Sequence, residues 1–265
     1  MIQELFSQNR LFSILHEALA GEVGASHALL RELMDYIDVY ARVNHVSGES
    51  AESAYLKFIG AYRKDVLDFM RTGCYPMGDR EIARVEYDLA LLLSTVLTSP
   101  RFRIMQLLVE RALPADRSLF IGVGSGVELY LLRHRLKIAE AFDLCINPFL
   151  KDLMPTMTFH EEEFNAGNGL YGQIFLIEIL EHLEDPLHLV SQCGQSLQEG
   201  GEIHMTTATN IPQFDHRVNF PKDHCAFDSW LIEQGYQILF CEDIPHPPAP
   251  KGIGAQNRFY TISQR

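Results

Sequence analysis

Residues 118–132, SLFIGVGSGVELYLL, decide how the second half of this 265-residue chain folds. The apolar start of the segment predicts a buried β-strand, and the apolar residues at its end recur at the spacing of a helix. Gly122, Gly124 and Gly126 stand between the two predicted elements. Glycine permits a tight turn and a close approach of the backbone to a ligand, and the start of a helix offers free N–H groups. The segment therefore predicts a ligand-binding turn between a strand and a helix.

Beyond Asp116, short apolar runs alternate with segments of helical length, which is the pattern of βαβ units around a parallel sheet. The runs predict seven strands, over residues 118–123, 140–145, 157–160, 173–177, 202–207, 236–242 and 258–263. The segments between them predict helices over 128–136, 148–153, 185–197 and 228–234. We therefore expect an α/β fold with a mostly parallel sheet of seven strands in this half.

The first half of the chain has a different pattern. Apolar residues recur there at helical spacing, as in LLRELMDYI (29–37), and Gly, Pro and Ser interrupt them at intervals. The stretch YDLALLLSTVL (87–97) is apolar on nearly every side, so we expect a buried helix that packs this half onto the sheet. Residues 1–112 are thus predicted to form an all-α cap and oligomerisation domain, and residues 113–265 a separate α/β domain.

The composition is that of an ordinary globular protein, with 47% hydrophobic and 22% charged residues. The formal net charge of -13 argues against nucleic-acid and membrane partners, because an acidic surface repels phosphate backbones and anionic lipids. No uninterrupted apolar run has the roughly 18 residues that a spanning helix needs. The five cysteines include no C-x-x-C pair, so we expect reduced thiols in a cytoplasmic protein.

The segment QIFLIEILEHLEDPLHLV (173–190) is the most specific string in the chain. It reads as a strand that ends at Glu178, followed by Glu181-His182 and then by Asp185-Pro186 at the start of a helix. Asp can cap the free N–H groups of a helix, and Pro is tolerated at the first helical position. A Gly-Gly pair precedes the next predicted strand, so a strand, a helix and a strand follow one another in order.

Taken together, FIGVGSG and the EHLEDP segment resemble the class I S-adenosylmethionine-dependent methyltransferases, over about residues 116–265. The resemblance implies a Rossmann-like sheet with S-adenosyl-L-methionine as cofactor, and a loop of Gly122, Gly124 and Gly126 around its methionine part. One residue departs from the family pattern: Phe120 stands two residues before the first glycine, where the family often has an acid. Glu128 is the neighbouring candidate for the contact with the cofactor's amino group.

The resemblance also implies contacts for the rest of the cofactor. An acidic side chain after the second strand suits the two ribose hydroxyls, and Asp143 matches that position, with Asn147 as the alternative if the strand runs longer. Asn165, followed by Ala166, matches the residue that meets the adenine amino group. Glu178, at the end of the fourth strand, is expected beside the cofactor.

The connection TTATNIPQFDHRVNFPKDHCAFD (206–228) is long and polar, and such loops are often functional. We expect it to cover the acceptor pocket. An imidazole can take a proton from the acceptor, so His182, His216 and Asp215 are the candidate catalytic residues. His182 alternatively supports the cofactor loop, and the Asp-His pairs at 215–216 and 223–224 leave a metal site as an alternative, although we assign no metal ligand here.

These features predict a methyltransferase that acts on a small-molecule acceptor. The leaving group of a sulfonium departs neutral, so the rate depends mainly on in-line positioning in a closed pocket, and the helical half is expected to close that pocket. We also expect the helical half to supply the contact of a homodimer. Two alternatives remain: another reaction of S-adenosylmethionine, such as aminocarboxypropyl transfer or a cyclisation that releases methylthioadenosine, and a non-catalytic cofactor-binding subunit.

Overall fold

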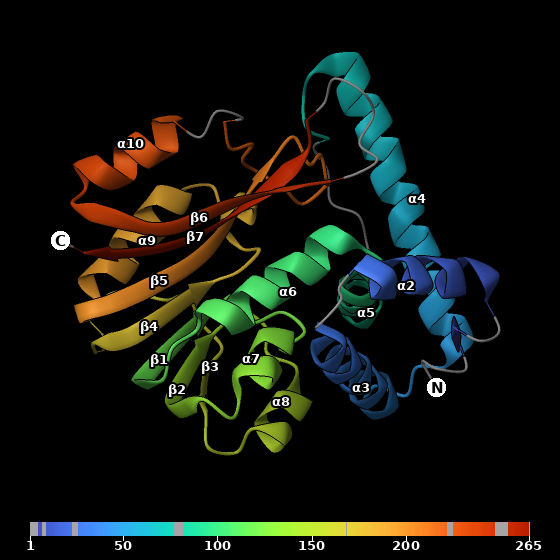
Figure 1. The fold of residues 1–265 in the computed structure, drawn as a ribbon, viewed down its shortest axis with the longest axis horizontal. Helices are drawn as coiled ribbons and strands as arrows, with labels where there is room; N and C mark the ends of the chain where they lie inside the picture. The colour runs from blue at the N-terminus through green and yellow to red at the C-terminus, as the bar shows by residue number, and fades with distance from the viewer. Residues whose placement is uncertain are drawn as a thin grey trace.

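The computed structural model describes residues 5–6, 9–22, 26–76, 82–167, 169–221, 225–246 and 254–264. The described part of the N-terminal half is helical, and its elements are α2 (Arg10–Glu22), α3 (His27–Val43), α4 (Gly48–Thr72), α5 (Arg84–Leu97) and α6 (Ser99–Arg111) (Figure 1). Local sequence sets several of their ends. The hydroxyl of Ser47 accepts a hydrogen bond from the amide of Ser50 at 3.1 Å at the start of α4, and Gly73 ends that helix with a φ of 70°.

The second half forms a sheet of seven strands in the order β3-β2-β1-β4-β5-β7-β6. The strands are β1 (Ala115–Ile121), β2 (Leu136–Phe142), β3 (Thr158–His160), β4 (Tyr171–Leu176), β5 (Leu197–Thr209), β6 (Tyr236–Pro245) and β7 (Gln256–Gln264). All neighbouring strands are parallel except at β7, which is antiparallel to both β5 and β6. The expected α/β fold with a mostly parallel sheet of seven strands, preceded by helices, is confirmed.

Helices connect these strands, and they are α7 (Val127–Leu132), α8 (Pro148–Leu153), the 3-10 turn η2 (Leu180–His182), α9 (Pro186–Gln195) and α10 (Cys225–Glu233). The prediction for α8 is confirmed in both of its ends. Asp185 caps α9 as predicted, because its carboxylate accepts a hydrogen bond from the amide of His188 at 3.0 Å.

The predicted position of β2 is wrong by several residues. The sequence predicts a helix up to residue 136 and a strand over 140–145, whereas α7 ends at Leu132 and β2 already begins at Leu136. Leu136 lies opposite Ala115 of β1, so pairing along the sheet extends β2 toward its amino end. β5 is also longer than predicted, because Leu197 pairs with Tyr171 of β4 at its amino end and the last residues pair with β7 at its carboxyl end. Long-range pairing of this kind overrides local propensity.

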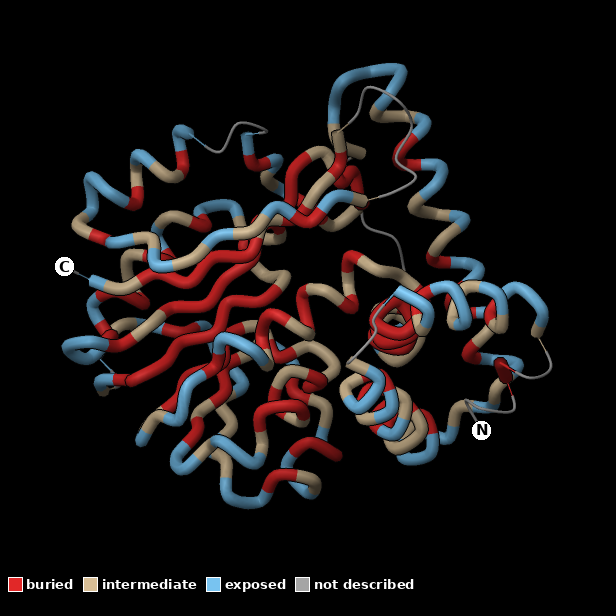
Figure 2. Tube along the Cα trace, viewed as in Figure 1, coloured by how far each residue is buried: buried red, intermediate tan, exposed pale blue. Residues whose placement is uncertain are grey.

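The two faces of the sheet are covered by different helices, as the alternation of side chains along a strand requires. Phe120 and Phe175 belong to a core that they share with α3, α5, α6 and α7. Leu119 and Ile174, their neighbours in sequence, point to the opposite face and pack with residues of α9 and α10. Figure 2 shows the result: the central strands are buried almost throughout.

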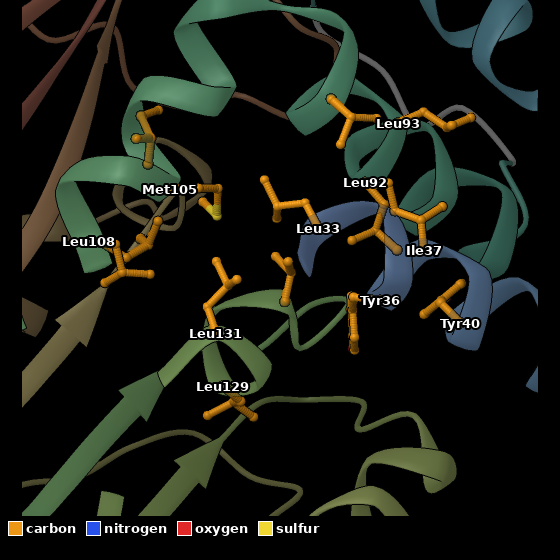
Figure 3. Packing of buried hydrophobic residues seen from close by; sticks show 14 of the residues in the cluster. Leu33, Tyr36, Ile37, Tyr40, Leu92, Leu93, Met105, Leu108, Leu129 and Leu131 are labelled. Atoms are coloured by element: carbon orange, nitrogen blue, oxygen red, sulfur yellow. The ribbon is translucent and has the colours of Figure 1, made fainter. Parts of the chain in front are cut away.

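The N-terminal helices pack onto the first of these faces. α5 is buried along most of its length and contacts α2, α3, α4 and α6. α6 contacts β6, β7 and α7, and α3 also contacts α7. The 87–97 segment is buried as expected, and its Tyr87 reaches the loop after β5. In Figure 3, leucines and tyrosines of α3 and α5 meet Met105 and Leu108 of α6 and Leu129 and Leu131 of α7. One continuous core therefore joins the helices to the sheet, and the division into two domains stays a prediction.

Across the described residues, no helix combines the length and hydropathy needed to cross a bilayer. Cys193 is buried and the other four cysteines are exposed; all five are free thiols.

Candidate active site

The glycine turn follows β1 and leads into α7. Gly122, Gly124 and Gly126 all have positive φ values, of 74°, 52° and 80°, which side chains other than glycine adopt only with strain. A Cβ atom at Gly122 would lie 2.7 Å from Cδ1 of Ile179, and one at Gly126 would overlap Leu150. A Cβ at Gly124 would meet no atom within 4 Å. The turn is therefore closely packed at its two ends and open in the middle.

Asp143, the candidate ribose contact, follows the end of β2 and lies against this turn. Its Oδ2 accepts a hydrogen bond from the amide of Gly124 at 3.0 Å, and its Oδ1 accepts one from the amide of Cys145, also at 3.0 Å. Asn147, the alternative, instead caps α8 by accepting a hydrogen bond from the amide of Phe149 at 3.3 Å. The structure thus brings Asp143, and not Asn147, to the glycine turn.

Asn165, the candidate adenine contact, lies in the loop after β3 and is exposed. Its amide group donates a hydrogen bond to the carbonyl of Glu163 at 3.3 Å. The neighbouring Glu161 is exposed and accepts a hydrogen bond from the amide of Ile146 at 3.2 Å. That bond, with help from Lys151, lowers the pKa of Glu161.

Glu178 lies two residues beyond the end of β4 and has a φ of 53°, which is rare outside glycine. Its amide donates a hydrogen bond to the hydroxyl of Thr206 at 2.7 Å, and its carboxylate accepts one from the side chain of Asn257 at 3.0 Å. The carboxylate also forms an ion pair with Arg101 of α6. Burial raises the pKa of Glu178, but the Arg101 guanidinium, the hydrogen bond with Thr206 and two nearby histidines together lower it by more, so the net pKa is lowered. Glu178 is therefore held as a carboxylate.

Arg101 is a site residue that sequence reasoning missed, because no motif marks it and it lies in the helical half. Its charge also acts on Glu128 in the first turn of α7. Burial raises the pKa of Glu128 to about 7; Arg101 opposes this shift and Glu178 adds to it. Beside the glycine turn, the structure thus collects one guanidinium and two carboxylates.

The three predicted catalytic residues come together at the end of β4. Nδ1 of His182 lies 3.1 Å from the carbonyl oxygen of Asp215, and the rings of His182 and His216 meet edge to face with centroids 4.9 Å apart. The Asp215 carboxylate accepts hydrogen bonds from the hydroxyl of Tyr87 at 2.6 Å and from the amide group of Gln213 at 2.8 Å. α5, η2 and the loop after β5 therefore all contribute to one polar cluster.

Burial and neighbouring charges shift the pKa values of His216 and Asp215. Burial lowers the pKa of His216 to about 4, with a further contribution from His182. Burial raises the pKa of Asp215, but the two histidines lower it and the net pKa is below its usual value. The favoured state is thus a carboxylate at Asp215 beside a neutral imidazole at His216.

Glu181 was also missed, although it stands next to His182 in the EHLEDP segment. Its side chain is only 1% exposed, and its Oε2 has no hydrogen-bond partner. Its backbone carbonyl accepts hydrogen bonds from the amides of Arg217 and Val218, at 2.7 and 3.1 Å, which fix the 206–228 loop against η2. Burial raises the pKa of the Glu181 carboxyl to about 7.

Other polar residues of the 206–228 loop form separate hydrogen bonds or are not described. Asn210 bonds with Asn219, which in turn accepts a hydrogen bond from the hydroxyl of Tyr75 at 2.9 Å. Asp223 and His224 lie outside the described residues.

No family model and no curated protein matches the sequence. Among solved structures, the N-methyltransferase NodS from Bradyrhizobium japonicum WM9, in complex with S-adenosyl-L-homocysteine, matches with a TM-score of 0.51. The match covers 63% of this chain and 88% of that one, at 12% identity. This chain has the fold of the class I S-adenosylmethionine-dependent methyltransferases. The strand order 3-2-1-4-5-7-6 of its sheet is the order of that methyltransferase fold.

Two further matches have lower TM-scores. The Burkholderia thailandensis 1,6-didemethyltoxoflavin-N1-methyltransferase matches with a TM-score of 0.48 at 15% identity, over 71% of this chain and 93% of that one. The [4+2]-cyclase SpnF also has a TM-score of 0.48, at 14% identity, over 61% of this chain and 80% of that one.

The methyltransferase fold explains why distant segments meet. In an open α/β sheet, ligands bind beyond the carboxyl ends of the parallel strands. The glycine turn follows β1, Asp143 follows β2 and Glu178 follows β4, so all three lie at that edge. His182 and His216 reach the same edge from η2 and from the loop after β5.

Proposed function

We propose that this protein is an S-adenosylmethionine-dependent methyltransferase that acts on a small-molecule acceptor. The observation that carries the proposal is the contact between Asp143 and the open centre of the glycine turn, at the carboxyl ends of a methyltransferase sheet. That contact joins the candidate ribose and methionine subsites into one continuous surface.

The cofactor would lie along this surface. The turn formed by Gly122, Gly124 and Gly126 holds the methionine part, where the open space at Gly124 admits a ligand. Each Asp143 oxygen accepts one amide hydrogen bond and keeps a second lone pair for a ribose hydroxyl. Asn165 is the proposed contact for adenine.

Phe120 leaves the amino group of the cofactor without the acid that the family often places there. Glu128 and Glu178 are the proposed replacements, because both carboxyl groups lie near the Arg101 charge beside the turn. Arg101 can compensate only one of these two negative charges. An ammonium group bound between Glu128 and Glu178 would therefore compensate the other.

The acceptor would bind beside His182, Asp215 and His216. Methyl transfer from a sulfonium depends mainly on orientation, and the acceptor must lose its proton as the methyl group arrives. His182 is oriented by Asp215, and it is the proposed proton acceptor of this cluster. Tyr87 ties α5 to Asp215, so the helical half is proposed to close the pocket over a small acceptor. A homodimer and a cytoplasmic location stay predictions.

Calorimetric titration with S-adenosylmethionine and S-adenosylhomocysteine tests the cofactor site. We expect micromolar binding by the wild type, at least a 10-fold loss in Asp143→Ala, and no change in Asp116→Ala. Asp116 is the matched control because it is an exposed aspartate at the opposite end of the sheet. Absence of binding to either ligand by the folded wild type would overturn the proposal.

Mass spectrometry of incubations with candidate acceptors tests the reaction. S-adenosylhomocysteine together with a methylated product supports methyl transfer. Methylthioadenosine would contradict it and point to transfer or cyclisation of the aminocarboxypropyl arm.

A further inference from the structure

We propose that Glu181, His182 and His216 bind a divalent transition-metal ion at the carboxyl end of β4. Each side chain offers one ligand atom, and these three atoms lie within 4.8 Å of one another. Glu181 and His182 come from η2, and His216 comes from the loop after β5, so the fold and not the sequence assembles the set.

Two of the three residues have buried atoms without a partner. Glu181 is 1% exposed and His216 is 5% exposed, and neither Oε2 of Glu181 nor Nδ1 of His216 forms a hydrogen bond. Buried polar atoms nearly always have a partner, so each exception calls for an explanation. A carboxylate oxygen and an imidazole nitrogen are both lone-pair donors. A cation is the partner that satisfies both.

One nitrogen of the His182 imidazole is already held by the backbone. Nδ1 of His182 lies 3.1 Å from the carbonyl oxygen of Asp215, which leaves Nε2 as its coordinating atom. Nδ1 of His216 is buried and has no hydrogen-bond partner, so it is the proposed coordinating atom of that ring. Metal-binding histidines usually donate their second N–H to a carbonyl or carboxylate, because this fixes the tautomer and the ring orientation.

Asp215, whose backbone carbonyl contacts His182, is itself fixed by hydrogen bonds. Its carboxylate accepts hydrogen bonds from Tyr87 and Gln213, and Gln213 also donates to the Tyr87 hydroxyl at 3.0 Å. The carboxylate lies 3.7 Å from Nδ1 of His182, so a negative charge stands directly behind one proposed ligand. This charge favours a cation at the site.

The donor set indicates which ions fit. Two imidazoles and one carboxylate suit Zn²⁺, Co²⁺, Mn²⁺ or Fe²⁺, whereas Mg²⁺ and Ca²⁺ prefer oxygen ligands throughout. Bonds of about 2.1 Å place neighbouring ligand atoms roughly 3 to 3.5 Å apart, so modest side-chain rotations complete the site. Three protein ligands leave coordination positions open for water or a substrate oxygen.

The metal site does not depend on the proposed methyl transfer, but it has a consequence for it. With the two histidines as ligands, the cation would lower the pKa of a coordinated acceptor hydroxyl, and that proton would pass to solvent water. The cation would then replace His182 as the group that activates the acceptor. This consequence rests on the proposed function. It favours acceptors that offer oxygen atoms.

Titration of the chelator-treated full-length protein with Co²⁺, followed by visible absorption and calorimetry, tests the site. We expect one equivalent to bind with micromolar or tighter affinity and Zn²⁺ to displace it. Glu181→Gln and His216→Gln should each lower the affinity about 100-fold or more. His188→Gln, in an exposed histidine of α9, should not change it.

Circular dichroism shows whether each variant is folded, so that a loss of binding is not mistaken for unfolding. Co²⁺ should raise the melting temperature of the wild type but not of Glu181→Gln. Absence of binding by the folded wild type, or equal binding by all variants, would overturn the proposal. A parallel titration with S-adenosylmethionine distinguishes the two proposals, because failure to bind the nucleoside leaves a measured metal site intact.

Discussion

Arg101 of α6 forms a buried ion pair with Glu178, which lies two residues beyond the end of β4 in a left-handed backbone conformation. This pair joins the helical half to the edge of the sheet where the candidate cofactor residues lie. Both side chains are largely buried, so each charge depends on the other for compensation. The helical segment is therefore part of the site, and its position depends on a charge placed by the strand end.

Removal of the guanidinium should destabilise the protein strongly. Arg101→Met leaves the Glu178 carboxylate buried without a countercharge, and loss of one partner of a buried pair costs about 3 to 5 kcal/mol. Urea denaturation measures this effect. Arg71→Met is the control, because its exposed pair with Asp68 at 3.0 Å should contribute less than about 1 kcal/mol. Equal effects of the two substitutions would contradict the assigned role of the Arg101 pair.

Glu128 should make stability depend on pH near neutrality. Its folded pKa is raised from 4.5 to about 7, so below pH 4.5 the group is protonated in both states. Between these values the folded state binds more protons, and its stability falls as the pH rises, by up to about 3 kcal/mol. Glu128→Gln lacks this loss, so its advantage over the wild type should grow from pH 5 to pH 8 in urea denaturation.

Glu199→Gln, which removes an exposed carboxylate at the start of β5, is the matched control for that measurement. Its stability should follow the wild type across the same pH range. A constant difference between Glu128→Gln and the wild type would argue against a raised pKa of Glu128 in the folded state.

Substitutions in the glycine turn should affect folding stability and ligand binding to different extents. Gly124→Ala meets no neighbouring atom, so only its φ of 52° opposes the change and the cost should be about 1 to 2 kcal/mol. The added methyl group occupies the space proposed for the cofactor, and binding of S-adenosylmethionine should fall at least 10-fold. Calorimetry and thermal melting measure the two effects.

Gly126→Ala should behave differently, because its Cβ overlaps the side chain of Leu150 in the core. Overpacking of this kind, added to a φ of 80°, should cost more than the Gly124 change, about 2 to 4 kcal/mol. If Gly124→Ala binds the cofactor normally, the ligand does not pass through the centre of the turn.

Tyr87 should act through Asp215 and not on the substrate directly. Tyr87→Phe removes the hydroxyl that donates to the Asp215 carboxylate at 2.6 Å and accepts from Gln213. Loss of one charge-assisted hydrogen bond corresponds to about 1.5 to 3 kcal/mol, so kcat should fall about 10-fold or more while KM for S-adenosylmethionine stays constant. Tyr236→Phe, at a buried hydroxyl between β6 and α9, is the control. A change in the KM for S-adenosylmethionine alone would place Tyr87 at the cofactor instead.

β1 and α9 were predictable because their signals lie within the segments themselves. β1 ends with an apolar run directly before the glycines, and α9 begins at Asp185-Pro186, where Asp185 is its cap. β2 was misplaced because Leu136 and its neighbours join the sheet only through pairing with β1. No periodicity within the segment carries that information.

The sequence by itself determined the class of fold, the glycine turn and the EHLEDP segment, because these depend on the local chemistry of glycine, caps and apolar alternation. Only the tertiary structure decided that Arg101 faces Glu178 and that His216 joins Glu181 and His182. These residues lie far apart along the chain, and a parallel sheet brings them together because its strands end at one edge. Contacts between such distant residues depend on the topology of the whole sheet and on burial, and no single stretch of sequence contains that information.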